Sequence, residues 1–537
     1  MIRLFQFFIL SLLSVFINTD RTFAQNENCN IEYNWAVNLN WKSVYYNKVD
    51  FINSDNNNSY IYEIDKKNEF INIFIISRDS GTLKSTIQIF LPSQYLESEI
   101  IGVSVVKTNV ILLSSFINQK DNKTYYFRES FSLDTRKGIG DLKMIFEMPI
   151  LKKDITTNFI KSKSRNYFAF IVYNYKGFNN IGSYAYVLDK EFNLSYSSND
   201  LFNQIAGFSF IDEFYLTDIG SLHSIIRTFI DIEEVDRTRK VKVEYDFKNV
   251  YNINLHLQNY LYQICSIDKN RTTPTLTKIL SPQEKFIKYL TIENIDSLCY
   301  LVGTFSNKNN LNDCGVFTYK LDLKNEYNEY LLINEYQSFE NGFHDPYLTN
   351  VDKGLKNSAL KEDSIGVWDY YNIINRGFCK YKNGYLCFLQ KVIRVNYARK
   401  YNEYYPTIFY DYIYAIYYDK TGEIVKTFII PMHQKETLNE IITYKEYRSS
   451  INVIDDKLFV IYNDFNPKYA VKDKYKKIVV LEYNEKLEYK TCEILIDDAI
   501  KYGIFTFDEW ICNNKLLGFG YQKTKPWFLV FDIKNNH

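Results

Sequence analysis

A short pattern of strand, turn and strand recurs eight times along this chain of 537 residues. Each copy has an alternating apolar stretch, then Asp or Asn, then a few turn residues, then a second alternating stretch. Alternation with a period of two is typical of strands, and Asp or Asn can cap a turn with its own side chain. The turn positions are Asp79, Asp134, Asp189, Asp246, Asp322, Asp419, Asn484 and Asp532.

The repeat predicts an all-β fold built from small, similar sheets. Another apolar strand precedes most copies, as in NVILLSSFIN and KLFVIYNDFN, so each unit should be an antiparallel sheet of three or four strands. Radial stacking of such sheets gives a β-propeller. We therefore expect about eight four-stranded blades. Seven blades are the alternative, because the copy at Asp246 is the least regular and an extra hairpin could lie at 260–280.

The last copy is cut off by the end of the sequence, after three strands. The missing strand can come from the N-terminal segment 30–40, NIEYNWAVNLN. Such a closure would seal the ring and remove two exposed strand edges.

The first 24 residues have the form of a secretory signal peptide. Arg3 precedes an apolar run that is too short to span a bilayer, and the small-residue ending Thr22-Phe23-Ala24 follows. We expect cleavage after Ala24 and export to the periplasm or the cell exterior, with an uncleaved anchor as the alternative. The mature residues 25–537 are expected to form a single propeller domain without a transmembrane segment, with a large insertion between blades at about 335–375.

The charge balance excludes one class of partner. Lys plus Arg equals Asp plus Glu, at 64 each, so no overall field attracts nucleic acid. We expect a protein or glycan ligand instead, and the oligomeric state is left open.

In repeat form, the chain resembles the broad group of bacterial secreted β-propellers with degenerate blade repeats. The resemblance covers nearly the whole mature chain and concerns the fold alone, since no motif of a particular propeller family is present. It implies no activity and no site residues.

The longer connections point to a binding surface. Tight Asp turns should lie at one face and long connections at the other, and ligand sites concentrate in loops on a rigid scaffold. In RVNYARKYNEYYP, cationic and aromatic side chains alternate, a combination suited to acidic glycans or to a protein hot spot. The predicted ligand-binding residues are Arg394, Tyr397, Arg399, Lys400, Tyr404 and Tyr405, with His344, Asp345 and Trp368 from the large insertion.

The cysteines of an exported chain can form disulfides. FCKYKNGYLC reads as a hairpin, and a three-residue turn would set Cys379 opposite Cys387. Cys299 and Cys314 are a second candidate pair. The alternative is that all four are small buried apolar residues.

Catalytic and metal-binding motifs are absent from the sequence. There is no HExxH, no GxSxG, no phosphate-binding glycine loop and no zinc spacing, so we expect no cofactor and no metal site, and the catalytic residues are unknown. Whether the protein is an enzyme stays open, because carboxylates from different blades have no fixed spacing. The leading hypothesis is a secreted non-enzymatic binding or scaffold module. The alternative is a carbohydrate-active propeller enzyme, a glycosidase or a lyase.

Overall fold

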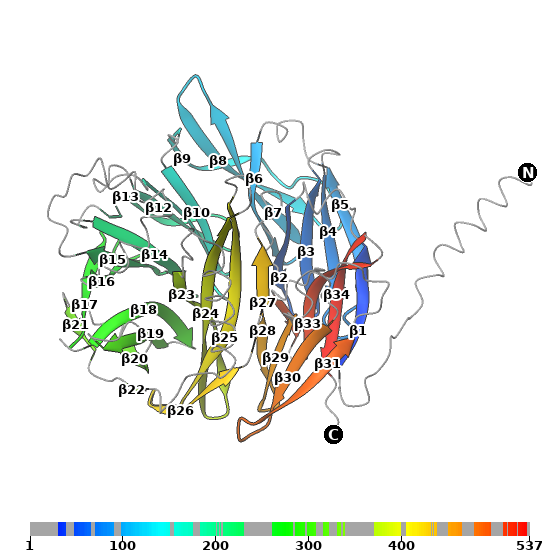
Figure 1. Cartoon of the computed structure of the whole chain (residues 1–537). Helices are drawn as coiled ribbons and strands as arrows, with labels where there is room; N and C mark the ends of the chain where they lie inside the picture. Colours follow the sequence, from blue (N-terminus) through cyan, green and yellow to red (C-terminus); the bar gives the residue numbers. More distant parts are fainter. Residues whose placement is uncertain are drawn as a thin grey trace, which may run out of the picture. The chain divides into compact units, whose positions relative to one another are not determined.

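Strands account for all regular secondary structure in the described residues of the computed structural model (Figure 1). No helix occurs among these residues, and so none there could cross a membrane. The structure describes residues 31–38, 48–65, 70–90, 98–150, 155–174, 183–199, 201–202, 205, 208–229, 260–282, 285–295, 298–307, 315–321, 330–333, 337–338, 370–398, 404–430, 432, 434–437, 449–463, 477–495, 509–512, 514–522 and 525–533.

The strands form eight sheets, which we number in chain order. They fall into two units by their internal contacts, and unit 2 holds sheets 2 to 6. Sheets 2 and 3 have four antiparallel strands each: β6 (Ser98–Val106), β7 (Asn109–Asn118), β8 (Lys123–Ser132) and β9 (Lys143–Pro149), then β10 (Ile155–Lys161), β11 (Tyr167–Asn174), β12 (Tyr184–Asp189) and β13 (Leu194–Asn199).

Sheets 4 to 6 complete unit 2. Sheet 4 comprises β14 (Phe208–Leu216), β15 (Leu222–Phe229), β16 (Tyr260–Ile267), β17 (Thr275–Leu280) and β21 (Tyr330–Leu332). Sheet 5 comprises β18 (Lys285–Ile295), β19 (Leu298–Asn307), β20 (Gly315–Leu321) and β22 (Gln337–Ser338). Sheet 6 comprises β23 (Tyr370–Tyr381), β24 (Gly384–Ala398), β25 (Tyr404–Tyr418), β26 (Ile424–Ile430) and β27 (Gln434–Thr437).

Unit 1 holds most of sheet 1 together with sheets 7 and 8. Sheet 1 comprises β2 (Lys48–Ser54), β3 (Asn58–Asp65), β4 (Phe70–Ser77) and β5 (Leu83–Phe90). Sheet 7 comprises β28 (Ser450–Ile454), β29 (Lys457–Asn463), β30 (Lys477–Tyr483) and β31 (Tyr489–Leu495). Sheet 8 comprises β32 (Glu509–Cys512), β33 (Lys515–Gln522), β34 (Lys525–Ile533) and β1 (Ile31–Asn38).

The N-terminal strand completes the last sheet, as the sequence predicts. β1 pairs antiparallel with β34, from Ile31 opposite Ile533 to Asn38 opposite Trp527. The pairing supplies the fourth strand of sheet 8 and occupies the hydrogen-bonding edge that β34 would otherwise expose. The prediction that residues 25–537 form one domain remains a prediction.

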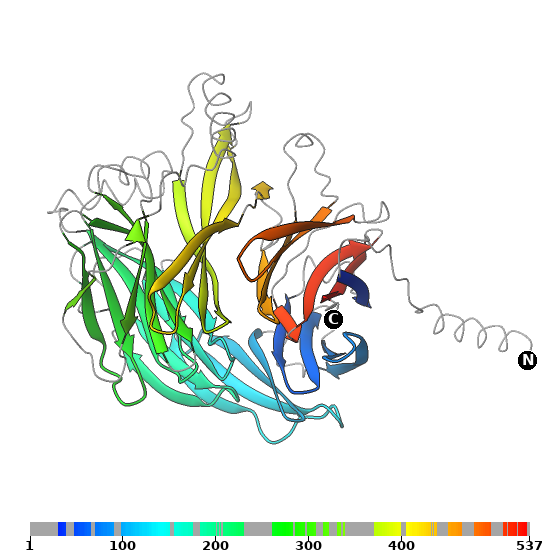
Figure 2. The ribbon, with the colours of Figure 1, turned by 90° about the horizontal axis from the view of Figure 1, so that it is seen from below.

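Neighbouring sheets of unit 2 pack face to face through apolar side chains. One core cluster joins sheets 2 and 3, and further clusters join sheets 3 and 4, 4 and 5, and 5 and 6. Figure 2 shows these sheets following one another in chain order, coloured from cyan to yellow. An inner strand such as β7 is therefore covered on both faces, and its sequence is a nearly continuous apolar run. The outermost strand β5 of sheet 1 is largely exposed instead.

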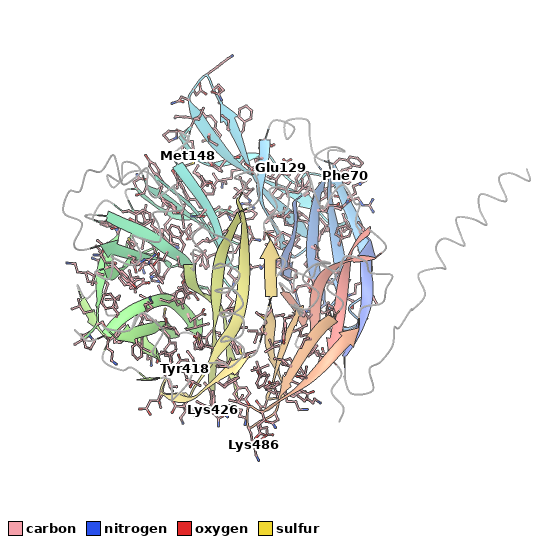
Figure 3. The ribbon with its side chains drawn as sticks, viewed as in Figure 1. Phe70, Glu129, Met148, Tyr418, Lys426 and Lys486 are labelled. Atoms are coloured by element: carbon pink, nitrogen blue, oxygen red, sulfur yellow. The ribbon has the colours of Figure 1, made fainter. Side chains whose placement is uncertain are left out.

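Three of the predicted Asp or Asn turns share one geometry between the third and fourth strands of their sheets. The side-chain Oδ1 of Asp189 accepts hydrogen bonds from the backbone N–H of Glu191 and Asn193, at 2.8 and 2.9 Å. Asp419 and Asn484 accept the same pair of bonds. Tyr418 and Lys486, labelled in Figure 3, mark these two turns. The third residue after the Asp or Asn has a positive φ in every case: Phe192, Gly422 and Leu487.

Removing the turn cap should weaken unit 2 measurably. Asp189→Ala deletes both acceptor bonds and should lower the free energy of unfolding by about 1 kcal/mol, seen as a lower midpoint in urea. Asp189→Asn keeps the acceptor oxygen, as Asn484 does in this chain, and is the matched control. Equal losses in both variants would show that the carboxylate charge matters rather than the cap.

Most first strands carry a β-bulge. Register shifts occur in six of the eight, at Phe51/Asn53, Ile100/Gly102, Ile211/Glu213, Ile287/Tyr289, Asn375/Gly377 and Trp510/Cys512. A bulge leaves one residue unpaired and bends the strand, which re-aims the neighbouring side chains. Most of the blades therefore share a bulge in the first strand, and some also share the turn between the third and fourth strands.

The hairpin between the third and fourth strands of sheet 4 lies at Asp268 and not at the predicted turn position Asp246. The third and fourth strands of sheet 4 are β16 and β17, joined by a turn in which Asp268 caps the N–H groups of Asn270 and Arg271, at 2.7 and 2.9 Å. The segment 260–280 is therefore the regular hairpin of this blade and not an extra one. Asp246 lies outside the described residues. The count of eight sheets is confirmed.

The repeat at Asp322 also differs from the expectation. The strand after this turn, β21, pairs in parallel with β17 of sheet 4, so that Tyr330 lies opposite Lys278. Sheet 5 instead takes the two-residue strand β22 as its fourth strand. Asp322 and most of the predicted insertion 335–375 lie outside the described residues.

Candidate ligand-binding surface

Each sheet has two unlike edges. Here an edge is the border along which the strands of a sheet begin and end, and not its outer strand. The turn edge holds the connection between the first and second strands, and the loop edge is the opposite border. The first connection is two to five residues long in every sheet. Loop-edge connections include 30 residues between Phe229 and Tyr260 and 31 between Ser338 and Tyr370, although some are short. The predicted asymmetry is therefore present only in part, because connections at the turn edge also include ten residues between Ser132 and Lys143.

Part of the predicted patch lies on strands rather than in a loop. β24 and β25 are 15 residues long each. Arg394 therefore pairs with Tyr370 and Ile408, and Tyr397 pairs with Tyr405. Tyr404 is the first residue of β25 and lies opposite Ala398. The hairpin of β24 and β25 extends to Ala398 and Tyr404, into the segment that was predicted to be a loop.

The other predicted binding residues lie outside the described part of the chain. They are Arg399, Lys400, His344, Asp345 and Trp368. A ligand-binding role for the whole predicted set stays a prediction.

The cysteine hairpin exists, but its register differs from the prediction. The turn between Tyr381 and Gly384 has two residues instead of three, so Cys379 lies opposite Leu386 and Cys387 lies opposite Phe378. Side chains alternate between faces along a strand, so a one-residue change turns Cys379 and Cys387 to opposite faces. Both thiols are free, as is that of Cys299, and Cys314 lies outside the described residues.

A cluster of charged and aromatic side chains lies toward the loop edge of sheets 4 and 5. The guanidinium of Arg227 forms an ion pair with Asp212, with Nη2 and Oδ1 2.9 Å apart. The same guanidinium lies over the ring of Tyr260, 5.4 Å from its centroid. Phe286 contacts the Tyr260 ring edge-on at 5.9 Å. We call Asp212, Arg227, Tyr260, Lys285 and Phe286 the loop-edge cluster.

Hydrogen bonds from tyrosine hydroxyl groups of sheet 4 to backbone carbonyl groups of sheet 5 connect the two sheets at this cluster. Tyr260 donates to the carbonyl of Ile287 at 2.7 Å, and Tyr262 donates to the carbonyl of Lys288 at 3.2 Å. These carbonyls belong to the bulge of β18, and Asp212 is the residue that the bulge of β14 leaves unpaired. The ammonium of Lys285 lies 4.6 Å from the centroid of the Phe305 ring. The bulges thus provide rigid anchor points for the cluster.

Burial raises the pKa of two acidic groups in and beside the cluster. The pKa of the Asp212 carboxyl is raised by burial, although the charge of Arg227 and its hydrogen bond act in the opposite direction. Burial raises the pKa of Tyr262 well above its usual range, so that its hydroxyl keeps its proton. Arg227, Tyr260, Lys285 and Phe286 remain half-buried, so part of each is open to a ligand. An Arg with flat rings around it is typical of binding hot spots.

Sequence reasoning missed this cluster because no short motif contains it. Asp212 and Arg227 lie on paired strands, but the 30-residue connection separates Arg227 from Tyr260. Lys285 and Phe286 belong to the next sheet. Strand pairing and blade packing bring these residues together, and neither can be read from local spacing.

A second polar group, around His223, lacks the arrangement of a catalytic triad. Nδ1 of His223 lies 2.8 Å from the Ser266 hydroxyl, and Asp268 is close enough to raise the pKa of the imidazole. However, Nε2 of His223 is buried and has no hydrogen-bond partner among the described residues. Burial lowers the pKa of His223 to about 4, which makes the imidazole a weak base.

A metal site is likewise not visible within the described residues, where no three His, Cys, Asp or Glu side chains gather closely enough to hold an ion.

Comparison with known proteins yields similarity to solved structures only. No family model and no curated protein matches the sequence. The chain is similar to the WD40 domain of SCAP from fission yeast, at 8% identity over 91% of this chain and 95% of that chain, with a TM-score of 0.33. It is similar to the polysaccharide lyase Uly1, at 8% identity over 80% and 89%, with a TM-score of 0.31. It is also similar to the β-propeller domain of the Trilobed protease from Pyrococcus furiosus, at 9% identity over 83% and 95%, with a TM-score of 0.30.

The chain is an eight-bladed β-propeller protein by its own sheet order. Eight sheets, antiparallel apart from the β17–β21 pair, follow one another along the described sequence, and the N-terminal strand supplies the last strand of the eighth. The predicted fold class, a β-propeller of about eight blades, is confirmed, and the resemblance stated from the repeats holds at the level of the fold. Closure of the ring by the N-terminal strand stays a prediction. The similar structures have low TM-scores and different activities, so they do not indicate a ligand or a reaction.

Proposed function

We propose that the protein is an exported binding module that recognises a protein or glycan ligand at the loop edge of sheets 4 to 6. The observation that carries this proposal is the loop-edge cluster, where Arg227 pairs with Asp212 and lies over Tyr260. Bulges and hydrogen bonds hold the cluster in place, so little side-chain entropy is lost when a ligand binds. Export rests on the signal-peptide form of residues 1–24.

The predicted patch in β24 and β25 fits the same surface. Arg394 and Tyr397 lie near the loop-edge end of sheet 6, and sheet 6 packs on sheet 5. Sheet 5 in turn packs on sheet 4. Cationic and aromatic residues therefore gather along the loop edges of three consecutive blades.

A charge reversal at Lys285 tests the proposal. The purified mature protein is applied to an array of neutral and acidic oligosaccharides, and separately cross-linked to the exported proteins of its host. Lys285→Glu should lose at least about tenfold in ligand affinity. Lys320→Glu, on β20 of the same sheet near its turn edge, is the matched control and should bind as the unmodified protein does.

Two results would contradict the loop-edge assignment. Equal binding by Lys285→Glu and the unmodified protein would remove the cluster from the ligand site. Equal loss in Lys285→Glu and Lys320→Glu would indicate an unspecific charge effect.

The predicted arginine pair allows a separate test. The double variant Arg394→Ala, Arg399→Ala should lose ligand binding and keep its melting temperature, because the two guanidinium groups are proposed to contact the ligand rather than the core. Calorimetry and the same binding assay measure both quantities. A fall in melting temperature together with the loss of binding would assign the arginines a structural role.

A further inference from the structure

Two glutamates from neighbouring blades, one buried and one half-buried, interact electrostatically in unit 2. Glu213 belongs to β14 of sheet 4 and Glu293 to β18 of sheet 5. Glu293 is only 7% exposed. The Thr291 hydroxyl forms a hydrogen bond with the Glu213 carboxyl, but Oε2 of Glu213 is buried and has no hydrogen-bond partner among the described residues. A buried carboxyl group that is not fully hydrogen-bonded is costly when it is charged.

Lys163 connects this pair to two further blades. It lies in the turn between β10 and β11 of sheet 3, and its ammonium donates a hydrogen bond to the carbonyl of Phe378 in β23 of sheet 6, at 2.9 Å. Its charge also acts on Glu293 and on Cys379. The residues involved therefore come from the first strands or first turns of four consecutive sheets. We call this set the axial cluster: Glu213, Glu293, Lys163 and the Phe378 carbonyl.

The surroundings of the axial cluster favour protonated carboxyl groups. Burial raises the pKa of Glu293 to about 8; the charge of Lys163 opposes this, and that of Glu213 adds to it. Burial raises the pKa of Glu213 to about 7; the Thr291 hydrogen bond opposes this, and the charge of Asp212 adds to it.

Besides Asp212, which acts on Glu213 and is paired with Arg227, the titratable groups around the axial cluster are thiols that stay neutral. Burial raises the pKa of Cys299 in β19 and that of Cys379 in β23 to about 12. Burial also raises the pKa of Cys387 in β24 well above its usual range. Within the described part of the chain, Lys163 is thus the one positive charge that acts on Glu293, and it can offset only one of two carboxylates.

We propose that Glu213, Glu293 and Lys163 form a pH-sensitive latch between blades 3 to 6 of the propeller. With both carboxyl groups protonated, Lys163 carries the only charge of these three groups, and its ammonium donates a hydrogen bond to the Phe378 carbonyl. When both carboxyl groups lose their protons, two negative charges lie close together in a buried site, and Lys163 offsets one of them. The first strands β14 and β18 then separate more easily, and the packing between sheets 4 and 5 weakens.

The direction of the pH effect follows from proton binding. Both carboxyl groups have a folded-state pKa above their ordinary value of 4.5. The folded protein therefore holds more protons than the unfolded chain between pH 4.5 and about 8, and its stability decreases as the pH rises through this range.

Replacement of Glu293 by the neutral Gln tests the latch. The melting temperature of the full mature chain is measured from pH 5 to pH 9 by calorimetry. Glu293→Gln should melt at least about 3 °C above the unmodified protein at pH 8.5, and its melting temperature should fall less between pH 6 and pH 9. Glu423→Gln, an exposed glutamate of sheet 6, is the control and should follow the unmodified protein.

A second variant keeps the test decisive if Glu293→Gln packs poorly. Lys163→Met removes the counter-charge, so it should lower the melting temperature at pH 8.5 more than at pH 5.5. The latch predicts that this extra loss disappears when Glu293→Gln is also present. The proposal is overturned if Lys163→Met has the same effect at both pH values, or if the loss persists in the double variant.

Discussion

Replacing Gly303 by alanine should lower the free energy of unfolding of unit 2 by about 3 kcal/mol. Gly303 lies in β19, between β18 and β20 of sheet 5. An added Cβ would lie 2.2 Å from the carbonyl oxygen of Tyr289 and 2.4 Å from Cζ of Phe317. The carbonyl belongs to paired backbone, and Phe317 is completely buried, so neither neighbour can move without cost.

The cost of Gly303→Ala is measured as a shift of the urea midpoint followed by circular dichroism. Gly138→Ala is the matched control, because its Cβ would meet only the Glu129 carboxyl oxygen, at an ordinary 3.5 Å. This control should unfold within about 0.5 kcal/mol of the unmodified protein. A stable Gly303→Ala variant would mean that sheet 5 is more loosely packed at its bulge than the structure has it.

The blade repeat could be predicted from sequence because it depends on local chemistry. Asp189, Asp419 and Asn484 cap their turns with their own side chains, so the turn and the alternating strands beside it form one recognisable pattern. For sheet 4 the pattern was assigned to Asp246, whereas the structure has the hairpin turn of this sheet at Asp268. The true turn at Asp268 spans the seven residues from 268 to 274 and therefore lacks the usual spacing.

Cross-strand geometry was less predictable, because it depends on exact turn length. The hairpin with Cys379 and Cys387 was found, but a turn shorter by one residue places Leu386 opposite Cys379. Because side chains alternate between the two faces of a strand, a register error of one residue places the Cys379 and Cys387 side chains on opposite faces of the sheet.

Contacts between blades leave almost no trace in sequence. Glu213 and Glu293 are 80 residues apart, and Lys163 donates to a carbonyl 215 residues away. Blade packing decides which first strands meet, and loops of varying length separate those strands. The loop-edge cluster and the axial cluster both depend on such contacts, which explains why the predicted site residues were drawn from two connections, 394–405 and the large insertion, instead.

Replacing Phe146 by alanine should have a comparable effect at the contact between sheets 2 and 3. The Phe146 ring stacks between those of Tyr126 and Tyr186, with centroids 4.3 and 4.0 Å away. Its removal leaves a cavity between two blades and should cost about 4 kcal/mol in urea unfolding. Met144→Ala, two residues earlier in β9 and 49% exposed, should change stability by less than about 0.5 kcal/mol.

Phe146→Leu separates ring stacking from simple burial. Leucine keeps most of the apolar volume but has no π-face, so this variant should lose the two stacking contacts, together about 1 to 3 kcal/mol. If Phe146→Leu is as stable as the unmodified protein, apolar volume alone joins the two blades. If it is nearly as unstable as Phe146→Ala, the flat ring is required, because only a planar side chain fits the narrow space between two tyrosines on adjacent sheets.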